Sequence, residues 1–189
     1  EVIKTDIVPH SGVQLACDGE KLPFPDGSLR ALFMIGVLHH VRETARLLAE
    51  ADRCLADGAR LVLIEPSNSW PQRFLTRKFS VIGEFSDNTV TEWRNEGNGP
   101  LTSANLALSW VIFVRDRRRF EERFPSLRIR DMRWQLWLAF YLSGGMTYRS
   151  FVPACLLPAV RWLEEFGAPL ARWIGTELIV EIEKVGASS

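Results

Sequence analysis

A strand–helix–strand pattern between residues 29 and 66 constrains the fold of this chain more than any other feature. Residues 29–37 form a nearly unbroken apolar run, which is typical of a strand buried on both faces. Between residues 41 and 55 apolar side chains recur every three or four positions, as in an amphipathic helix. Asp57-Gly58 ends this helix, and residues 61–64 form a second apolar run closed by Glu65-Pro66. The short joints predict a right-handed βαβ unit and therefore a parallel sheet.

Weaker periodicities outside this unit indicate the remaining elements. Residues 2–6 and 13–18 are short apolar runs that each end in an aspartate, which predicts two strands ahead of the unit. After Pro66 the sequence favours a helix that starts at Trp70 and a second helix that is capped by Asp116 and ends at Arg123. A half-exposed strand is expected from residue 127. The last elements are a helix over 153–166, interrupted near Pro158, and a strand over 178–183. No internal repeat is present, and 189 residues suit one domain spanning 1–189.

The composition narrows the classes of partner and compartment. Twenty-three basic side chains balance 23 acidic ones, so no long-range field attracts nucleic acid or an anionic membrane, and any such contact has to be local. The three cysteines form no CxxC pair, which suits a reducing, cytoplasmic location and no metal site. The longest apolar stretch, residues 134–142, is too short to span a bilayer. We therefore expect a cytoplasmic protein with no nucleic-acid partner and no transmembrane segment.

Two aspartates occupy the positions where a parallel sheet binds ligands, beyond the carboxyl ends of its strands. Asp6 directly follows a strand, and its carboxylate can accept hydrogen bonds from two vicinal ribose hydroxyls. Asp18 can accept a hydrogen bond from an adenine amine, while Gly19 beside it lets the backbone approach the ring. Aspartate is also favoured at strand ends for turn formation alone, which is the alternative for both residues.

Several segments, taken in order, carry a resemblance to a known family. They are residues 3–7, 17–28, 37–41, 53–58 and 63–66. Together they resemble the class I, Rossmann-like S-adenosylmethionine-dependent methyltransferases that act on small molecules. The resemblance implies an α/β fold with a mostly parallel sheet, helices on both faces and antiparallel C-terminal strands, for which residues 127–134 and 176–185 are the candidates.

The same resemblance assigns roles to individual residues. The cofactor would be S-adenosylmethionine, and the residues implied in binding it are Asp6, Asp18, Gly19, Val37, Leu38 and His39. Residues 67–126 would form an insertion on the acceptor side. Seven tryptophans, most of them in the second half, could line an apolar acceptor site, although most are expected in the core.

The chain departs from the family pattern in one major respect. It contains no strand followed by a GxGxG loop, the element that lets the backbone come close to the cofactor. Because the chain begins with Glu1 inside a strand-like run, we expect the first strand of the fold to be missing. In the family that strand lies between the strands predicted near Ile3 and Met34. Direct pairing of these two strands, self-association or a gap are the expected consequences. Two milder departures from the family pattern are Leu29-Arg30, at the start of the strand near Met34, and Asp57-Gly58-Ala59, at the turn after the following helix.

Four side chains are candidates for the acceptor side. His40 could act as a general base, because imidazole titrates near neutral pH, or be a histidine satisfied by backbone at a strand end. Glu65 could bind the acceptor or merely end its strand. Trp70 and Tyr148 would line one cavity with the segment 143–148, whose glycines permit a close approach; an ordinary turn after a closing strand is the alternative.

The sequence therefore predicts methyl transfer from S-adenosylmethionine to a small-molecule or lipid-like acceptor. The alternative is a non-catalytic scaffold, degenerate or truncated, that does not bind the cofactor. A nicotinamide enzyme is a weaker third option, because the phosphate loop and a set of proton-relay residues are both missing. A homo-oligomer is also expected as one outcome of the missing strand.

Overall fold

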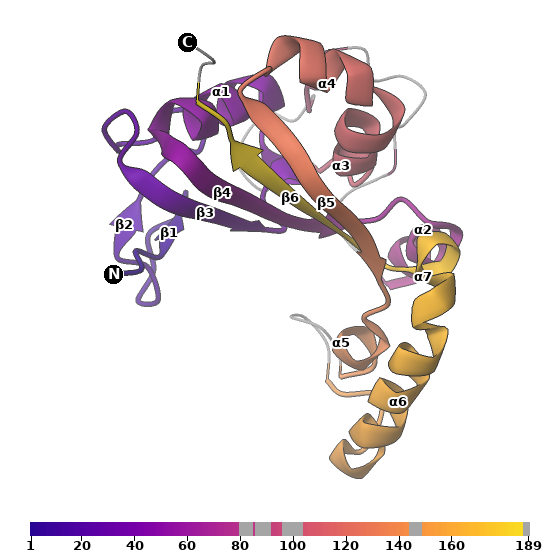
Figure 1. The fold of residues 1–189 in the computed structure, drawn as a ribbon. Helices are drawn as coiled ribbons and strands as arrows, with labels where there is room; N and C mark the ends of the chain where they lie inside the picture. Colours follow the sequence, from indigo (N-terminus) through magenta and orange to yellow (C-terminus); the bar gives the residue numbers. More distant parts are fainter. Residues whose placement is uncertain (80–84, 86–91, 96–103, 144–148, 187–189) are drawn as a thin grey trace.

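The computed structural model describes residues 1–79, 85, 92–95, 104–143 and 149–186 (Figure 1). These residues contain six strands and seven helices, together with short helical turns. The elements are, in order, β1 (Thr5–Asp6), β2 (Leu15–Ala16), β3 (Leu29–Ile35), the 3₁₀ turn η1 (Leu38–His40), α1 (Thr44–Cys54), β4 (Leu55–Pro66), α2 (Trp70–Phe79), α3 (Leu108–Trp110), the π-helical turn η2 (Val111–Arg115), α4 (Arg117–Arg123), β5 (Leu127–Gln135), α5 (Leu138–Leu142), η3 (Ala154–Leu156), α6 (Leu157–Gly167), η4 (Ala168–Leu170), α7 (Ala171–Ile174) and β6 (Glu177–Lys184). None of these helices has the length and apolar character of a bilayer-spanning segment.

The strands form one four-stranded sheet and one separate pair. The larger sheet has the order β3-β4-β6-β5, in which β3 and β4 are parallel and β6 runs antiparallel to both β4 and β5. Strands β1 and β2 pair with each other in parallel. The Rossmann-like α/β class is thereby confirmed, including the βαβ unit β3-α1-β4 and the antiparallel C-terminal strands β5 and β6.

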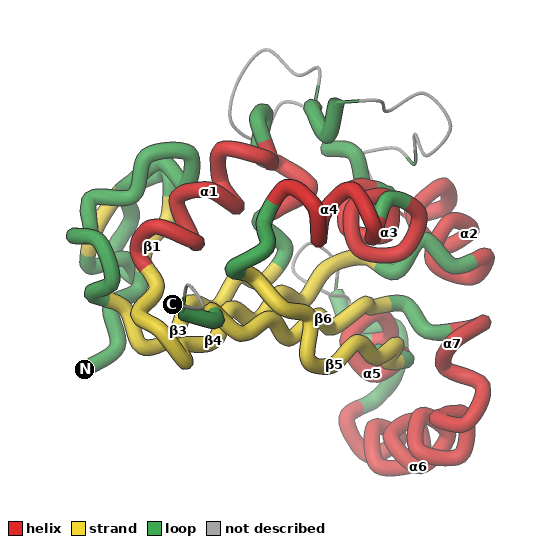
Figure 2. Tube along the Cα trace, turned by 45° about the horizontal axis from the view of Figure 1, so that its top comes forward, coloured by secondary structure: helices red, strands yellow, loops and turns green. Residues whose placement is uncertain are grey.

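One face of the larger sheet carries the hydrophobic core. Helices α1, α3 and α4 lie over this face, and α6 extends away from the far end of the sheet (Figures 1 and 2). The amphipathic pattern of α1 places its apolar positions inward, so that Leu47, Leu48 and Ala51 are at most 1% exposed. From the sheet, Leu61, Leu63, Leu178, Val180 and Ile182 meet them, all at 0% exposure.

Strand β3 differs from the expectation of burial on both faces. Met34 is buried, but Phe33 and Ile35, which point to the opposite face, are 68% and 66% exposed. The helices α1, α3 and α4 lie over the other face of the sheet, so Phe33 and Ile35 face solvent. Strand β3 is also an edge strand, because no ladder among the described residues joins it to β1 or β2. Direct pairing of β1 with β3 is therefore not observed. No strand within the described parts of residues 67–186 occupies the free edge either.

A Phe33→Lys substitution is expected to reduce self-association of the chain. A free strand edge beside exposed apolar side chains is a template for edge-to-edge pairing, and a lysine there blocks it. Sedimentation velocity over a range of protein concentrations measures the effect. Phe166→Lys is the matched control, since Phe166 is 74% exposed on α6, away from this edge. Equal behaviour of the two variants would contradict a role of the β3 edge.

Two helix starts differ in detail from the sequence analysis. Helix α4 has the predicted end, but the Asp116 side chain does not cap it. Its carboxylate instead accepts hydrogen bonds from Trp93 Nε1 at 2.9 Å and from the Arg115 guanidinium at 2.8 Å, and these contacts hold its pKa below the ordinary value. Pro158 does not kink a long helix, because it lies in the first turn of α6, after the separate turn η3.

Candidate functional site

Glu65 organises the chain at the carboxyl ends of β3 and β4. Its side chain is completely buried, and Oε1 accepts hydrogen bonds from the backbone amides of Val37 at 2.9 Å and Leu38 at 2.8 Å. Its other oxygen, Oε2, lies 2.5 Å from His39 Nδ1. Gly36, in the left-handed region at φ 63°, lets the chain turn sharply after β3 and brings these donors onto the carboxylate. Glu65 therefore fixes the turn that the resemblance assigns to the methionine end of the cofactor.

The two neighbouring histidines have different surroundings. His39 is buried against Glu65, and its backbone carbonyl accepts hydrogen bonds from Asn95 Nδ2 at 3.0 Å and from the Asn105 amide at 3.1 Å. The His40 ring lies beside the His39 ring, with centroids 4.2 Å apart and planes inclined by 42°. His39 thus belongs to a fixed hydrogen-bonded unit, and the catalytic role of His40 stays a prediction.

A second polar group, which the sequence analysis missed, lies near the same end of the sheet. Glu177, at the start of β6, is 7% exposed, and its Oε1 accepts a hydrogen bond of 2.9 Å from the Tyr141 hydroxyl. The same hydroxyl lies 3.1 Å from Gln72 Oε1 on α2. The three side chains come from positions 72, 141 and 177, so no local pattern joins them. The one available signal was an acidic residue beside the apolar run of the last strand.

Burial and neighbouring charge set the protonation of this group. Burial, together with the nearby charge of Glu65, raises the pKa of Glu177 to about 7, against the opposing effects of the Tyr141 hydrogen bond and His39. Burial also raises the pKa of Tyr141 well above its ordinary value, and Glu177 adds to this effect. A carboxyl group that exchanges its proton near neutral pH is suited to general acid–base chemistry.

Asp6 and Asp18 lie at the carboxyl ends of β1 and β2, as predicted. Both are exposed, and each uses one carboxylate oxygen to accept a backbone hydrogen bond of 2.9 Å two residues ahead, from Val8 and Glu20 respectively. These are the turn contacts that were the alternative to ligand binding. The second oxygen of the Asp6 carboxylate lies 3.7 Å from His10 Nε2. The turn contacts are therefore observed, and the binding of a nucleoside by these two carboxylates stays a prediction.

Gly19 packs closely against α1, and its predicted role beside the adenine stays a prediction. A Cβ atom at this position would lie 2.7 Å from Leu47 Cδ1. Since Leu47 is a buried side chain of α1, a larger residue at position 19 would push the loop away from the helix.

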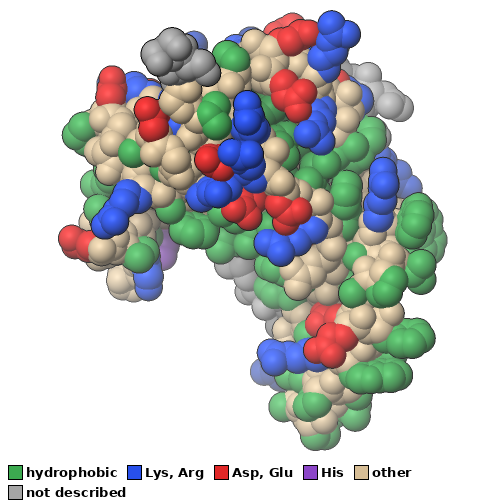
Figure 3. Space-filling model, in the orientation of Figure 1, with side chains coloured by type: hydrophobic (Ala, Val, Ile, Leu, Met, Phe, Trp, Pro, Cys, Tyr) green, Lys and Arg blue, Asp and Glu red, His purple; other side chains and the backbone are tan. Residues whose placement is uncertain are grey.

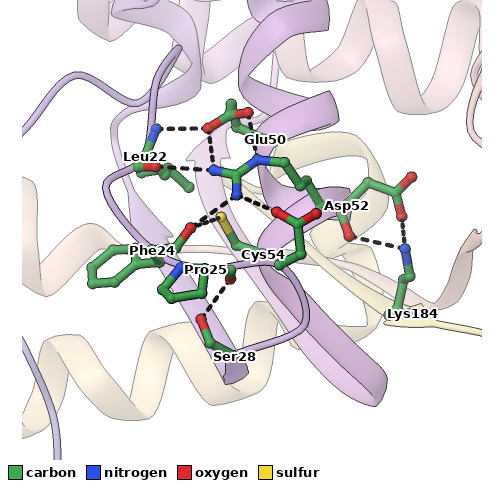
Figure 4. A network of polar contacts seen from close by, with 10 residues as sticks. Leu22, Phe24, Pro25, Ser28, Glu50, Asp52, Cys54 and Lys184 are labelled. Atoms are coloured by element: carbon green, nitrogen blue, oxygen red, sulfur yellow. Dashed lines mark hydrogen bonds and ion pairs between the residues drawn. The ribbon is translucent and has the colours of Figure 1, made fainter.

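The side chain of Arg53 joins the loop between β2 and β3 to α1. Figure 4 shows Leu22 and Phe24 of this loop close to Glu50 of α1. The Arg53 guanidinium donates to the carbonyls of Leu22 at 3.0 Å and Phe24 at 2.9 Å, and to the carboxylates of Asp26 and Glu50. Glu50 in turn accepts the Leu22 amide at 2.8 Å. This network fixes the segment that follows Asp18-Gly19. The hydrogen bond from Arg53 is the main reason why the pKa of Glu50 lies below its ordinary value.

The predicted acceptor residues are only partly placed. Trp70 is 77% exposed and stacks on Phe74 with ring centroids 6.1 Å apart, so its ring covers the surface of α2. From the same helix it is Gln72 that reaches the buried polar group. Tyr148, together with Gly144 and Gly145, lies outside the described residues.

Comparison with known proteins supports the resemblance drawn from the sequence. Residues 4–63 match the family described as the methyltransferase domain. This segment is a methyltransferase-family sequence. It contains β1, β2, β3, α1 and most of β4, and therefore Asp6, Asp18 and the turn that carries the two histidines.

One relative is similar in sequence over part of the chain, and two solved structures are similar in fold over most of it. An uncharacterised 37.1 kDa protein of a Streptomyces fradiae transposon is 43% identical over 63 residues, which is 33% of this chain and 18% of that protein. The chain thus spans less than a fifth of the length of this curated relative. A solved S-adenosylmethionine-dependent methyltransferase from Archaeoglobus fulgidus is 12% identical with a TM-score of 0.50, covering 96% of this chain and 75% of that one. A candidate methyltransferase from Bacillus halodurans is 13% identical with a TM-score of 0.50, covering 98% and 82%.

Proposed function

We propose that this chain takes part in methyl transfer from S-adenosylmethionine to a small-molecule or lipid-like acceptor. The observation that carries the proposal is the family match over residues 4–63, which includes every position assigned to the cofactor. The Rossmann-like order of the strands supports it, because such sheets bind ligands beyond the carboxyl ends of their strands.

The cofactor would supply an activated methyl group on a sulfonium, so the residues of the chain have to bind and orient rather than create the reactive group. Asp6 would accept the ribose hydroxyls, and Asp18 with Gly19 would hold the adenine. Val37, Leu38 and His39 would border the methionine end, on the turn that Glu65 fixes through its three contacts. A fixed turn aligns the reacting groups without further loss of entropy.

The acceptor side is proposed around the two buried polar groups. His40 is the proposed base toward the acceptor, and Glu65, Trp70 and Tyr148 are the proposed acceptor-binding residues, with residues 67–126 as the acceptor-side insertion. Glu177 is a second group that can take up a proton, since its pKa lies near 7. A base is needed only if the acceptor is a protonated hydroxyl or amine.

An Asp6→Asn substitution is expected to weaken binding of S-adenosylhomocysteine to this chain by about 5- to 150-fold. The amide oxygen preserves the turn contact to the Val8 amide, but the loss of charge weakens the ribose hydrogen bonds, a cost of about 1–3 kcal/mol. Isothermal titration calorimetry measures the affinity. Asp131→Asn is the control, because Asp131 is an exposed acid on β5, ion-paired with Arg133. Equal affinities of the wild-type chain and Asp6→Asn would remove Asp6 from the site.

The separation of the β1–β2 pair from β3 favours a second candidate function, a scaffold that does not bind the cofactor. The same calorimetry distinguishes the two. A folded wild-type chain that shows no binding heat at millimolar ligand would support the scaffold, whereas saturable binding that depends on Asp6 would support the methyltransferase.

A further inference from the structure

Five large apolar side chains lie exposed along α6, η4 and α7. They are Trp162, Leu163, Phe166, Leu170 and Trp173, with exposed fractions of 61%, 50%, 74%, 54% and 66%. We call them the arm surface. Figure 3 shows hydrophobic side chains gathered over the part of the molecule formed by α6 and α7, which projects from the end of the sheet. Soluble proteins rarely leave so much contiguous aromatic surface uncovered unless it binds something.

The arm surface lies on the outer side of α6, whose inner side packs against the rest of the protein. Val160 is 7% exposed, and Glu164 Oε1 accepts a hydrogen bond of 2.7 Å from the Ala139 amide at the start of α5. At Gly167 a Cβ atom would lie 3.3 Å from Leu136 Cδ2, so this end of α6 also packs closely. The helix is thus held in place by one face, and the aromatic face is presented outward.

Helix α2 adds a second exposed aromatic pair and positive charge. It packs against α7, and its Trp70 and Phe74 are 77% and 54% exposed. The rings of Trp162 and Phe166 stack with centroids 5.6 Å apart, as those of Trp70 and Phe74 do at 6.1 Å. The same residue types thus recur on α6 and on α2, the helix that packs against α7. Tryptophan is enriched where one end of a side chain meets hydrocarbon and the other meets water.

The charge of these helices distinguishes between two possible binding partners of the arm surface, a second copy of the chain and a lipid bilayer. Helices α2, α6 and α7 carry five basic and two acidic side chains, hence a net charge of +3, in a chain whose formal net charge is zero; the seven are Arg73, Arg77, Lys78, Arg161, Arg172, Glu164 and Glu165. In a symmetric dimer the same surface would face itself, and like charges would meet. An anionic lipid surface instead complements both the charge and the aromatic side chains.

We infer that the arm surface, with α2 beside it, binds to the surface of an anionic lipid bilayer. The aromatic and leucine side chains enter the headgroup region, and the basic side chains of α2 and α7 contact the lipid phosphates. The contact lies in the plane of the membrane and requires no spanning helix. This inference does not depend on the proposed methyl transfer.

Vesicle co-sedimentation tests the inference with the whole chain. The wild-type chain is expected to sediment with vesicles of phosphatidylcholine and phosphatidylglycerol in equal parts, and several-fold less with phosphatidylcholine alone. Trp162→Ser combined with Phe166→Ser is expected to weaken binding at least about tenfold. Arg77→Gln combined with Lys78→Gln is expected to reduce the preference for anionic vesicles while leaving binding to phosphatidylcholine unchanged.

Phe33→Ser is the matched control, because Phe33 is an equally exposed aromatic residue at the other end of the sheet. Circular dichroism confirms that each variant keeps its fold, as expected for surface positions. Absence of wild-type binding, or equal binding of wild type and the Trp162/Phe166 double variant, would overturn the inference. So would sedimentation velocity showing a wild-type dimer that the double variant abolishes, because the occupant would then be a second copy of the chain.

Discussion

Glu177→Gln is expected to stabilise the folded chain at pH 8 by about 3 kcal/mol more than it does at pH 4. The pKa of Glu177 is raised from its ordinary value of 4.5 to about 7, with Glu65, His39 and Tyr141 as the facing groups. The folded state therefore keeps the proton more tightly than the unfolded state. The stability that this proton confers is fully present below pH 4.5, declines between pH 4.5 and 7, and is lost above pH 7. Glutamine cannot ionise, so the variant avoids that loss.

Denaturant unfolding at several pH values measures this effect through the free energy of unfolding. Glu181→Gln is the control, because Glu181 lies on the same strand but forms a half-exposed ion pair with Arg60. A pH dependence that is the same in wild type and Glu177→Gln would show that Glu177 is ionised in the folded chain at neutral pH. The group would then lose its suitability for proton transfer.

Phe120→Ala is expected to destabilise the chain by about 3–5 kcal/mol. Phe120 on α4 is completely buried and packs edge-on against Phe113, with ring centroids 5.2 Å apart, and against Phe124 at 5.7 Å. Removal of the ring leaves a cavity between α4, η2 and the sheet, which the surrounding helices can close only in part.

The same substitution at Phe33 provides the comparison. Phe33 is 68% exposed on the bare face of β3, so Phe33→Ala is expected to change the free energy of unfolding by less than about 0.5 kcal/mol. Thermal or denaturant unfolding of both variants tests the assignment of core and surface together. If Phe33→Ala lowered the free energy of unfolding as much as Phe120→Ala does, the outer face of β3 would be covered in solution.

Local signals in the sequence were sufficient for the order of elements in the methyltransferase-like third of the chain. The switch from continuous apolar runs to a three-to-four-residue period located β3, α1 and β4, because these periods follow from the geometry of strands and helices themselves. The aspartates at the ends of β1 and β2 were found for the same reason, since a strand end is a local feature. The alternation that starts at residue 127 and the apolar run over 178–183 likewise predicted β5 and β6.

Contacts across long sequence separations were not predictable in this way. Residues 67–126, the proposed acceptor-side insertion, also contribute Ile112, Phe113 and Phe120 to the main core, which no local pattern indicated. Whether a continuous apolar run such as β3 is buried on both faces depends on whether helices cover both faces of the sheet, and the face of β3 that carries Phe33 is exposed.

The sequence by itself determined the Rossmann-like class, the family resemblance and the positions of Asp6 and Asp18, because each of these depends on spacing within a few dozen residues. Only the tertiary structure decided that Glu65 binds the turn after β3 and that Gln72, Tyr141 and Glu177 meet in one buried group. The physical reason is that these hydrogen bonds join different elements of the fold: the Tyr141 hydroxyl meets Gln72, 69 positions away on α2, and Glu177, 36 positions away on β6. Burial at that junction, and not the local sequence, then raises the pKa of Glu177 into the neutral range.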